Sequence, residues 1–291
     1  MKKILITGAG SYVGTCVADY LARWPERYRV DTVDMVDGSW REASFRGYDA
    51  VFHVAGIVHL AQAKDDPGQA ELYDRVNNRL AVETAQKAKA EGVGQFLFMS
   101  SESVYGLHAP IGRTVMITKD TPLNPVDNYG RSKAKAEEGL MALAGEGFQV
   151  LILRPPMIYG RGCKGNYVAM AKLARKLPVF PWVENRRSML YIDNLSEFIR
   201  LAVEDEAEGI YCPQNSEYVC TSDMVNLIAH ANGRGILMIK GVTWALKLLG
   251  HATGMVDKAF GSLCYDFELS RYPRDYCVKS FQESILETEK K

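Results

Sequence analysis

The stretch ILITGAGSYVGTCVADYLA, residues 4–22, decides the fold. An apolar, strand-like run ends at Thr7, a glycine-rich turn follows, and the next residues have the pattern of a helix. In such a turn glycines permit a tight bend and let the backbone approach a pyrophosphate, while the N–H groups of the helix N-terminus favour the anion. The order of strand, turn and helix therefore predicts a dinucleotide-binding unit.

The residues in and beyond this turn give the predicted cofactor contacts. Asp34 ends the second predicted strand, 20 residues beyond Gly14, where its carboxylate would accept hydrogen bonds from the adenosine ribose hydroxyls. It would also repel a 2′-phosphate, and Met35 supplies no cation, so NAD is favoured over NADP; the alternative is that Asp34 is only a turn residue. The turn residues predicted to bind the cofactor are Gly8, Gly10, Ser11, Tyr12, Val13 and Gly14.

Short apolar runs alternate with helix-length segments through the first half of the chain. The later runs are VDTVDM, AVFHVA, QFLFMS and QVLILR, and the predicted helices cover 12–24, 69–91 and 129–144. Nearly continuous apolar strings are typical of parallel strands that are covered on both faces. Repeated strand–helix–strand units predict the α/β class, with a doubly wound parallel Rossmann sheet.

The alternation breaks after Arg154, which predicts a second part of the chain. MLYIDNLSEFIRLAVED, residues 189–205, has the pattern of a strand followed by a helix that Asp193 or Asn194 would cap. The predicted domains are a NAD-binding Rossmann domain of residues 1–155, to which 189–208 return, and a smaller mixed α/β substrate lobe of residues 156–188 and 209–291.

Composition excludes several classes of function. Thirty-five basic residues balance thirty-five acidic ones, so no global field attracts nucleic acid. Six scattered cysteines, without a C-x-x-C pair or a metal-ligand cluster, predict reduced thiols in a cytoplasmic protein without a bound metal. No apolar run is long enough for a transmembrane segment, and residues 236–250, interrupted by Lys240 and Lys247, predict a helix packed on the lobe rather than one lying on a membrane.

NYGRSKAKAEE, residues 128–138, sets a tyrosine and a lysine four positions apart. On a helix, Tyr129 and Lys133 would therefore project side by side. A phenol with a pKa near 10 is a poor base at neutral pH, but an ammonium and an oxidised nicotinamide beside it would pull its pKa toward 7. The pair predicts a catalytic base, and the alternative is two solvated side chains on a helix surface.

Together with MSSESVYG after the fourth strand, these motifs make the chain resemble the extended short-chain dehydrogenase/reductase family. It is most similar to the NAD-dependent sugar-nucleotide epimerases and dehydratases, such as the UDP-glucose 4-epimerases. The motifs TGAGSYVG, YDAVFHVAG, RVNNRLAVETA, FLFMSSESVYG, YGRSK, LRPPMIYG and RSMLYIDNL follow in the family's order from Thr7 to Leu195. Two departures are Ser11 in place of the loop's middle glycine and Met157 in place of an asparagine that contacts the sugar.

The resemblance implies roles for residues of this chain. The implied catalytic residues are Ser101, Tyr129 and Lys133, and further cofactor contacts are Ala55, Asn77, Pro156, Tyr129 and Lys133. The implied substrate contacts are Ser101, Glu102, Asn166 and Arg187, the arginine lying at the nucleotide phosphates. Cys163 is an additional candidate for a reactive group near the substrate, against the alternative of an inert packed thiol.

The function that the resemblance implies is a NAD-dependent nucleotide-sugar 4-epimerase, an isomerase that forms a transient 4-keto sugar from a UDP-sugar. A 4-keto-sugar reductase and a 4,6-dehydratase are the enzymatic alternatives, although Ser103 stands where a dehydratase needs a base. A non-catalytic dinucleotide sensor is the alternative of another class. The resemblance also implies a homodimer that pairs through the helices of residues 69–91 and 129–144.

Overall fold

The computed structural model describes residues 1–58, 67–253 and 255–290, which divide into two compact units. Unit 1 comprises Met1–Gly106, Pro122–Pro155 and Ser196–Cys212. Unit 2 comprises Leu107–Thr121, Pro156–Leu195 and Pro213–Lys291. Of the helices in these described ranges, none combines the length and apolarity that crossing a membrane requires.

Unit 1 is built on a parallel sheet of six strands in the order β10-β6-β4-β3-β1-β2. The strands are β1 (Lys2–Thr7), β2 (Tyr28–Val33), β3 (Ala50–His53), β4 (Gln95–Met99), β6 (Gln149–Leu153) and β10 (Gly209–Tyr211). The strand order reverses at β1, because β2 lies on one side of it and β3 on the other. A crevice at the carboxyl ends of β1 and β3 is where such sheets bind ligands. The predicted doubly wound parallel fold is confirmed.

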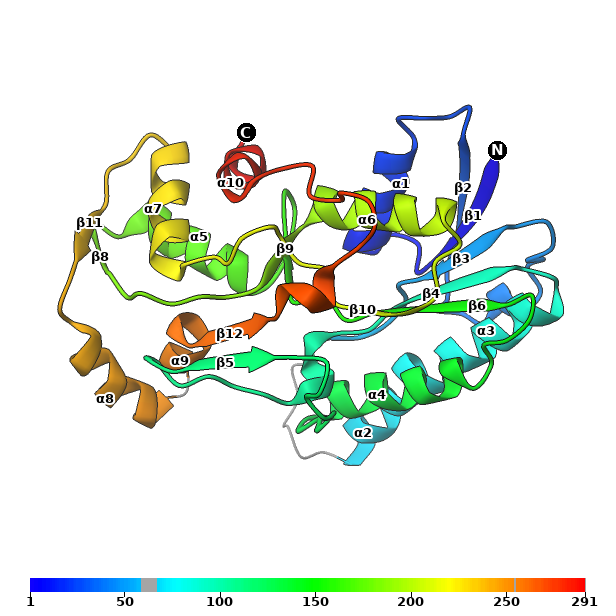
Figure 1. The fold of residues 1–291 in the computed structure, drawn as a ribbon, viewed down its shortest axis with the longest axis horizontal. Coiled ribbons are helices and arrows are strands. Elements are labelled where there is room, and N and C mark those ends of the chain that lie inside the picture. The colour runs from blue at the N-terminus through cyan, green and yellow to red at the C-terminus, as the bar shows by residue number, and fades with distance from the viewer. Residues whose placement is uncertain (59–66, 254, 291) are drawn as a thin grey trace. The chain divides into compact units, whose positions relative to one another are not determined.

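Helices cover both faces of this sheet. In Figure 1, α1 and α6 lie on one face and α2, α3 and α4 on the other, and a hydrogen bond from Tyr20 of α1 to Glu197 of α6 links the first pair. The bounds are α1 (Tyr12–Leu21), α2 (Pro67–Tyr73), α3 (Leu80–Ala90), α4 (Asn128–Met141) and α6 (Ile192–Glu204), with short helices η1 (Ser39–Arg41), η2 (Asp74–Arg79) and η3 (Glu102–Tyr105). Under α3 and α4, aromatic and aliphatic side chains such as Phe96, Phe98 and Phe148 form a solvent-free core.

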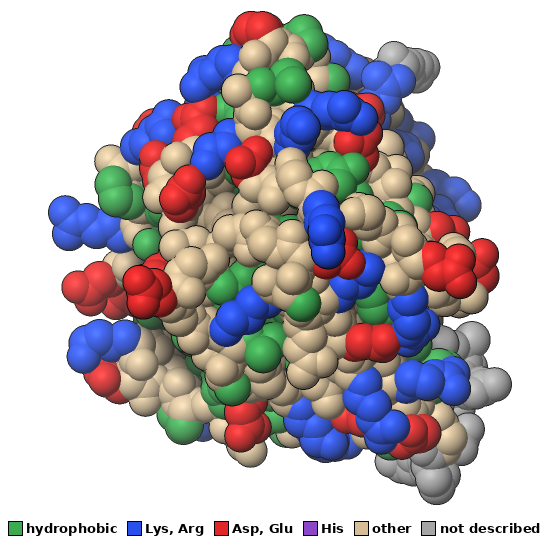
Figure 2. Space-filling model, turned by 90° about the vertical axis from the view of Figure 1, so that its right-hand side faces the viewer, with side chains coloured by type: hydrophobic (Ala, Val, Ile, Leu, Met, Phe, Trp, Pro, Cys, Tyr) green, Lys and Arg blue, Asp and Glu red, His purple; other side chains and the backbone are tan. Residues whose placement is uncertain are grey.

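The charges on the surface are mixed in sign where Figure 2 shows them. On that face Lys and Arg side chains alternate with Asp and Glu side chains, and neither sign forms a continuous patch. This pattern accords with the neutral net charge of the whole chain. A face of this kind does not produce the single-signed field that steers polyanions.

Unit 2 combines three pairs of parallel strands with packed helices. The pairs are β5 (Thr114–Ile117) with β12 (Ser262–Tyr265), β7 (Met157–Tyr159) with β9 (Met189–Tyr191), and β8 (Val179–Pro181) with β11 (Leu237–Ile239). The helices are α5 (Asn166–Lys176), α7 (Thr221–Ala231), α8 (Thr243–Thr253), α9 (Met255–Phe260) and α10 (Phe281–Glu289), with the short helix η4 (Phe267–Ser270). α7 packs against both α5 and α10, which gives this unit its own core.

The boundaries of the units differ from the predicted domains in three places. Residues 107–121 belong to unit 2 because β5 pairs with β12, and residues 189–195 do so because β9 pairs with β7. Residues 209–212 belong to unit 1 because β10 extends the main sheet beside β6. Each difference arises because strands far apart in the chain pair with one another. Patterns of neighbouring residues do not predict such pairing.

The predicted cap of α6 is wrong. The helix begins at Ile192, so Asp193 and Asn194 lie within its first turn. The Asn194 side chain is fully buried, donates to Asn215 Oδ1 (3.0 Å) and to the backbone oxygen of Lys279 (3.2 Å), and accepts from the Lys279 amide (3.0 Å). Its amide therefore ties the helix to the C-terminal segment instead of capping the helix.

Candidate active site

The glycine turn after β1 has the geometry that an approaching pyrophosphate needs. Gly8 and Gly10 adopt positive φ angles of 87° and 75°, which residues with a Cβ rarely adopt. A Cβ at Gly8 would lie 2.9 Å from the Cα of Ala55, whereas one at Gly10 would meet nothing within 4 Å. The backbone is thus packed on the Ala55 side and open at Gly10, so the residues present fit a dinucleotide on the N-terminus of α1.

Ser11, the departure from the family's loop, caps α1. Its Oγ accepts a hydrogen bond from the Gly14 amide at 3.2 Å, and a Cβ at Gly14 would lie only 2.6 Å from that oxygen. A serine at this position therefore satisfies one of the helix's unpaired N–H groups. The next two residues assigned to the cofactor, Tyr12 and Val13, form the first turn of α1 behind this cap.

The two predicted contacts at the ends of β2 and β3 have different surroundings. Ala55 is buried against the Gly8 turn. Asp34 follows the last residue of β2, is exposed, and accepts a hydrogen bond from the Val36 amide at 2.9 Å. Asp34 therefore takes part in the strand-end turn with its carboxylate at the surface, and its contact with the adenosine ribose stays a prediction.

Asn77 lies in the π-helical segment η2 and is completely buried. Its Oδ1 accepts from the Ile57 amide (2.8 Å), and its Nδ2 donates to the Ile57 carbonyl (2.9 Å) and to Ser132 Oγ (3.1 Å). A Cβ at Gly56 would lie 2.9 Å from Asn77 Oδ1. The side chain thus holds the backbone that follows β3 against α4, and a direct contact with the cofactor stays a prediction.

The three predicted catalytic residues meet at the carboxyl end of β4. Lys133, only 4% exposed, donates from Nζ to the carbonyl of Met99 at 2.7 Å and lies 4.5 Å from the centre of the Phe98 ring. One turn earlier on α4, the Tyr129 hydroxyl and Ser101 form a hydrogen bond. Ser101 directly follows Ser100 after the strand and caps η3 through the Ser103 amide (3.1 Å). The structure therefore brings Ser101, Tyr129 and Lys133 to one strand end.

The expected pull of Lys133 and an oxidised nicotinamide on the Tyr129 pKa stays a prediction, and in the chain without a cofactor the pKa is shifted the other way. Burial raises the pKa of Tyr129 to about 12, and only its hydrogen bond to Ser101 opposes that rise. Burial also lowers the pKa of Lys133 to about 7, against the attraction of Glu137. The reason is that the Lys133 amine is directed to Met99 and Phe98 in a desolvated site, so a neutral amine and a neutral phenol are favoured together.

Behind this site lies a buried ion-pair network that the sequence analysis missed. Arg154 donates to both Glu137 oxygens, with the shortest distance at 2.6 Å, and to the Tyr105 hydroxyl at 2.9 Å. Ser100 also hydrogen-bonds to Glu137. Glu137 lies one helical turn after Lys133, so the four-residue spacing in the sequence could have indicated that the two side chains are neighbours. The network joins α4, the end of β4 and the end of β6, so it fixes the elements that carry the candidate catalytic residues.

Glu102 begins η3 in unit 1, and three further predicted residues belong to unit 2. Pro156 is buried, and Asn166 is exposed at the first position of α5. Arg187 is partly buried, and its Nη1 donates to the carbonyls of Lys258 (2.6 Å) and Gly261 (3.3 Å). These contacts anchor the guanidinium to the segment after α9, and binding of substrate by these three residues stays a prediction.

Cys163 has the surroundings of a packed thiol. It is 8% exposed, and burial raises its pKa above the ordinary value. A thiol is reactive as the thiolate, which a raised pKa disfavours. The structure therefore favours the inert alternative for this residue.

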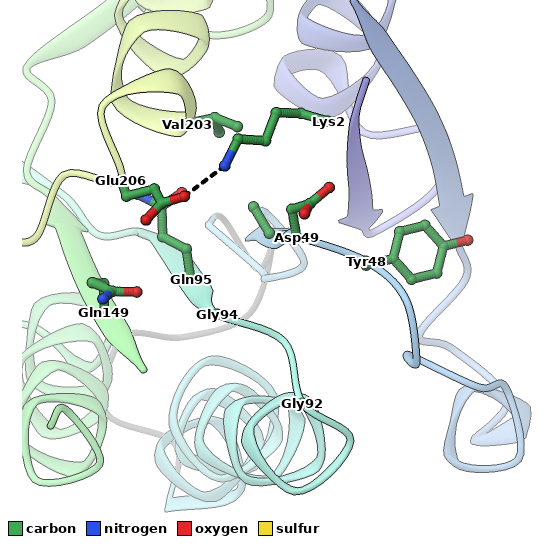
Figure 3. Close-up of a pocket in the computed structure, with 10 residues that line it drawn as sticks. Lys2, Tyr48, Asp49, Gly92, Gly94, Gln95, Gln149, Val203 and Glu206 are labelled. Carbon is green, nitrogen blue, oxygen red and sulfur yellow. Dashed lines mark hydrogen bonds and ion pairs between the residues drawn. The ribbon is translucent and has the colours of Figure 1, made fainter. Parts of the chain in front are cut away.

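A polar pocket lies at the opposite ends of the strands. Figure 3 shows it lined by residues at the amino ends of β1, β3, β4 and β6, including Lys2, Asp49, Gln95 and Gln149. Its volume is about 230 Å³. Lys2 Nζ is 2.6 Å from a carboxylate oxygen of Glu206 across it. Because parallel sheets bind ligands at their carboxyl ends, this pocket is separate from the candidate active site.

Comparison with known proteins agrees with this geometry. Residues 4–212 match the family model described as "NAD dependent epimerase/dehydratase family". The chain is 30% identical over 290 residues to UDP-glucose 4-epimerase of Vibrio cholerae, covering 91% of this chain and 87% of that protein. It is 28% identical over 250 residues to GDP-6-deoxy-D-mannose reductase of Pseudomonas aeruginosa, covering 78% and 79%.

Among solved structures, the fold is similar to that of UDP-glucuronic acid 4-epimerase from Bacillus cereus in complex with NAD. The TM-score is 0.72 at 16% sequence identity, and the match covers 98% of this chain and 96% of that one. Identity at this level is evidence for the fold alone. Both units of the chain therefore have a counterpart in that fold.

We expect Glu137→Gln to lower the free energy of unfolding by about 3–5 kcal/mol, because it leaves the buried guanidinium of Arg154 without its carboxylate. Urea unfolding followed by circular dichroism measures the change. Glu138→Gln, at the neighbouring exposed position, is the control and should change the value by less than about 0.5 kcal/mol. Equal effects of the two substitutions would contradict a stabilising role of the network.

The lowered pKa of Lys133 predicts a pH dependence of stability. Between about pH 7 and 10.5 the unfolded chain binds more protons at this amine than the folded chain does, so its contribution to stability rises with pH and is lowest below pH 7. Lys133→Met removes this titration. The quantity to follow is the free energy of unfolding of the variant minus that of the wild type. We expect this difference to fall by a few kcal/mol between about pH 7 and pH 10.5, as measured by urea unfolding.

The control for this comparison is Lys135→Met, at an exposed position of the same helix. Its difference from the wild type should stay nearly constant over the same range of pH. If the Lys133→Met difference were equally constant, the amine would be charged in the folded chain throughout, contrary to the direction inferred from its burial.

Proposed function

The chain belongs to the NAD dependent epimerase/dehydratase family, and from this premise we propose that it is a nucleotide-sugar 4-epimerase. It is an enzyme whose cofactor is NAD. The observation that carries the proposal is the meeting of Ser101, Tyr129 and Lys133 at the end of β4, on the same carboxyl edge of the sheet as the glycine turn after β1. The similarity to UDP-glucose 4-epimerase over nine tenths of the chain supports the choice of reaction.

In this proposal Tyr129 removes the proton of the sugar 4-hydroxyl, and Ser101 holds that hydroxyl by a hydrogen bond. When bound, NAD supplies the acceptor for a hydride that later returns to the other face of the 4-keto sugar. Bringing the Tyr129 pKa from about 12 to near 7 requires about 7 kcal/mol of stabilisation of its phenolate. The chain alone does not provide this, so positive charge must enter the site before Tyr129 can act as a base.

Lys133 provides part of that charge. Its pKa of about 7 leaves it divided between amine and ammonium at neutral pH, and a phenolate one helical turn away favours the ammonium. An ammonium has three donors, of which the structure shows one on Met99. We propose that the others hold the nicotinamide ribose hydroxyls, which would orient the reactive ring toward Tyr129.

The other proposed substrate contacts are polar side chains, two of which lie at the first position of a helix. Glu102 begins η3 directly after Ser101, and Asn166 begins α5. Arg187 supplies a guanidinium, whose N–H groups can bind the oxygens of a nucleotide diphosphate. Pro156 would line the nicotinamide pocket. The nucleotide sugar is proposed to be a UDP-sugar, as the name of the Vibrio cholerae relative suggests.

A reductase of 4-keto nucleotide sugars is the second candidate. GDP-6-deoxy-D-mannose reductase of Pseudomonas aeruginosa is 28% identical to this chain in sequence, close to the 30% of the epimerase relative. Both reactions use the same tyrosine, serine and lysine, and they differ in whether the cofactor leaves after one hydride transfer. A dehydratase is less well supported, because Ser103 stands in place of the base and donates its amide to Ser101.

We also propose that the chain forms a homodimer through the helices of residues 69–91 and 129–144, and the exposed surface that supports this lies along α4. A shallow groove of about 510 Å³ runs along α4, and its surface is mainly apolar. Leu123 and Met141 line it and are 41% and 39% exposed, and Ile210 beside them is 46% exposed. A second copy of this face would cover these side chains.

The function is tested by turnover of a panel of UDP-, GDP- and dTDP-sugars, with products separated by chromatography, and by dialysis of the purified protein. We expect interconversion of 4-epimers with NAD absorbance retained after dialysis. Tyr129→Phe should lower turnover about 10²–10⁴-fold and still retain NAD, because it removes only the acid–base group. Tyr73→Phe, whose ring packs edge-on at 6.3 Å from that of Tyr129, is the matched control and should keep most of the activity.

Full activity of Tyr129→Phe would contradict the proposed base. NAD that exchanges freely, together with consumption of a 4-keto sugar and a stoichiometric reductant, would assign the reductase instead. Retained NAD without turnover of any nucleotide sugar would assign a sensor.

The dimer is tested by sedimentation velocity at micromolar concentration. We expect a dimer for the wild type and a monomer for Met141→Glu, because a carboxylate would be buried without a partner in the interface. Met116→Glu in unit 2, at an equally exposed methionine (40%), is the control and should stay dimeric. A monomeric wild type would contradict the proposal.

A further inference from the structure

The small sheet of unit 2 formed by β8 and β11 turns an apolar face to solvent. Val179 pairs in register with Leu237, and Pro181 pairs with Ile239, so these four side chains share one face. Val179, Leu237 and Ile239 are 42%, 65% and 41% exposed, whereas Phe180, which points to the other face, is 4% exposed. One face of this sheet therefore packs in the core, and the other remains apolar and uncovered in the described chain.

The helix that follows also exposes apolar side chains. Figure 1 shows α8 next along the chain after β11 in unit 2. Trp244 and Leu248 lie four positions apart on it, and they are 68% and 66% exposed, with the exposed Lys247 on the same turn. The sequence analysis predicted that residues 236–250 form a helix packed on the lobe. That prediction is wrong for residues 237–239, which form β11, and the helix begins only at Thr243.

The two chain segments that meet here carry positive charge only. Residues 160–183, which include β8, and residues 233–256, which include β11 and α8, contain no aspartate or glutamate. Their basic residues are Arg161, Lys164, Lys172, Arg175, Lys176, Arg234, Lys240 and Lys247. Arg175 forms an ion pair with Glu289 at 2.6 Å. The pairing of β8 with β11 brings the two acid-free segments, with their other basic residues, to the same part of unit 2.

We propose that this surface of unit 2 docks on an anionic lipid bilayer. It is defined by the exposed side chains Val179, Leu237, Ile239, Trp244 and Leu248 with Lys176, Arg234, Lys240 and Lys247, and is called the basic apolar surface below. Its tryptophan and leucines would enter the headgroup region, where an indole finds both apolar and polar surroundings. Its lysines and arginine would face the anionic headgroups.

The charge distribution favours a lipid surface over a second copy of the chain. A symmetric dimer uses the same surface of both copies. A dimer through this surface would therefore place the basic segments of one copy against the basic segments of the other. Like charges would then oppose association. A bilayer that contains phosphatidylglycerol presents the opposite charge and an apolar interior together, which matches both features.

Co-sedimentation of the full chain with vesicles tests the proposal. Vesicles of phosphatidylcholine and phosphatidylglycerol in a two-to-one ratio are compared with vesicles of phosphatidylcholine alone. We expect at least about tenfold tighter binding to the anionic vesicles and a blue shift of tryptophan fluorescence. The double variant Trp244→Ser, Leu248→Ser should lose about tenfold or more of this binding. Trp244→Phe should keep the binding and lose most of the blue shift.

Charge is tested separately from apolar contact. Lys240→Gln with Lys247→Gln should weaken binding about fivefold for each charge removed, and added salt should weaken the wild type in the same direction. Lys119→Gln with Lys290→Gln, at exposed positions of unit 2 outside the surface, is the matched control. Its binding should remain within about twofold of the wild type.

Leu286→Ser on α10, at a leucine that is 46% exposed, is the control for loss of an exposed apolar side chain. Circular dichroism and thermal unfolding verify that every variant is folded. Equal binding to neutral and anionic vesicles, or unchanged binding of the Trp244, Leu248 double variant, would overturn the proposal. Absence of vesicle binding together with self-association that this double variant abolishes would assign the surface to a second copy of the chain.

Discussion

The candidate site depends on one buried amine at the end of a buried strand. Lys133 is nearly free of solvent, donates to the carbonyl of Met99 and faces the ring of Phe98. Burial disfavours its charge, while the carboxylate of Glu137 one turn later favours it. The amine is thereby held close to the point at which it gains or loses a proton near neutral pH. A charged ligand or a neighbouring phenolate can change its state at small cost.

The chain without its ligands does not activate Tyr129, and this is informative about the mechanism. The phenol is protonated because burial raises its pKa, and its only described stabilising partner is Ser101. A base that forms only when positive charge enters the site cannot act on stray substrates beforehand. In the proposed reaction, binding and activation are therefore linked through the same desolvated space, in which electrostatic interactions are strong.

Rigid surroundings make this linkage possible. Arg154 and Glu137 form a buried pair that joins two strand ends to α4, and Asn77 fixes the backbone after β3 to the same helix. These groups do not carry the proposed chemistry themselves. They restrict movement of α4 relative to the sheet, so the distances among the candidate catalytic side chains are set by packed elements rather than by loops.

Many features of unit 1 could be predicted from short stretches of the sequence. The glycine turn, the alternation of apolar strands with helices, and the spacing of Tyr129 and Lys133 each involve residues close together in the chain, and short-range physics specifies them. The same spacing logic would have found Glu137. It would not have found Arg154, whose pairing with Glu137 joins a strand end to a helix that begins 26 residues earlier.

Tertiary structure alone decided the rest. The direction of the pKa shifts follows from how much water each group loses, and the sequence does not report that quantity. Pairing between distant strands places residues 107–121 in unit 2 and residues 209–212 in unit 1, contrary to the predicted domains. The same kind of pairing brings the two acid-free segments together at β8 and β11. The sequence by itself determined which elements form and which chemical groups they carry. Which groups are buried, paired or left at the surface was decided only by packing, because burial is a property of the whole fold.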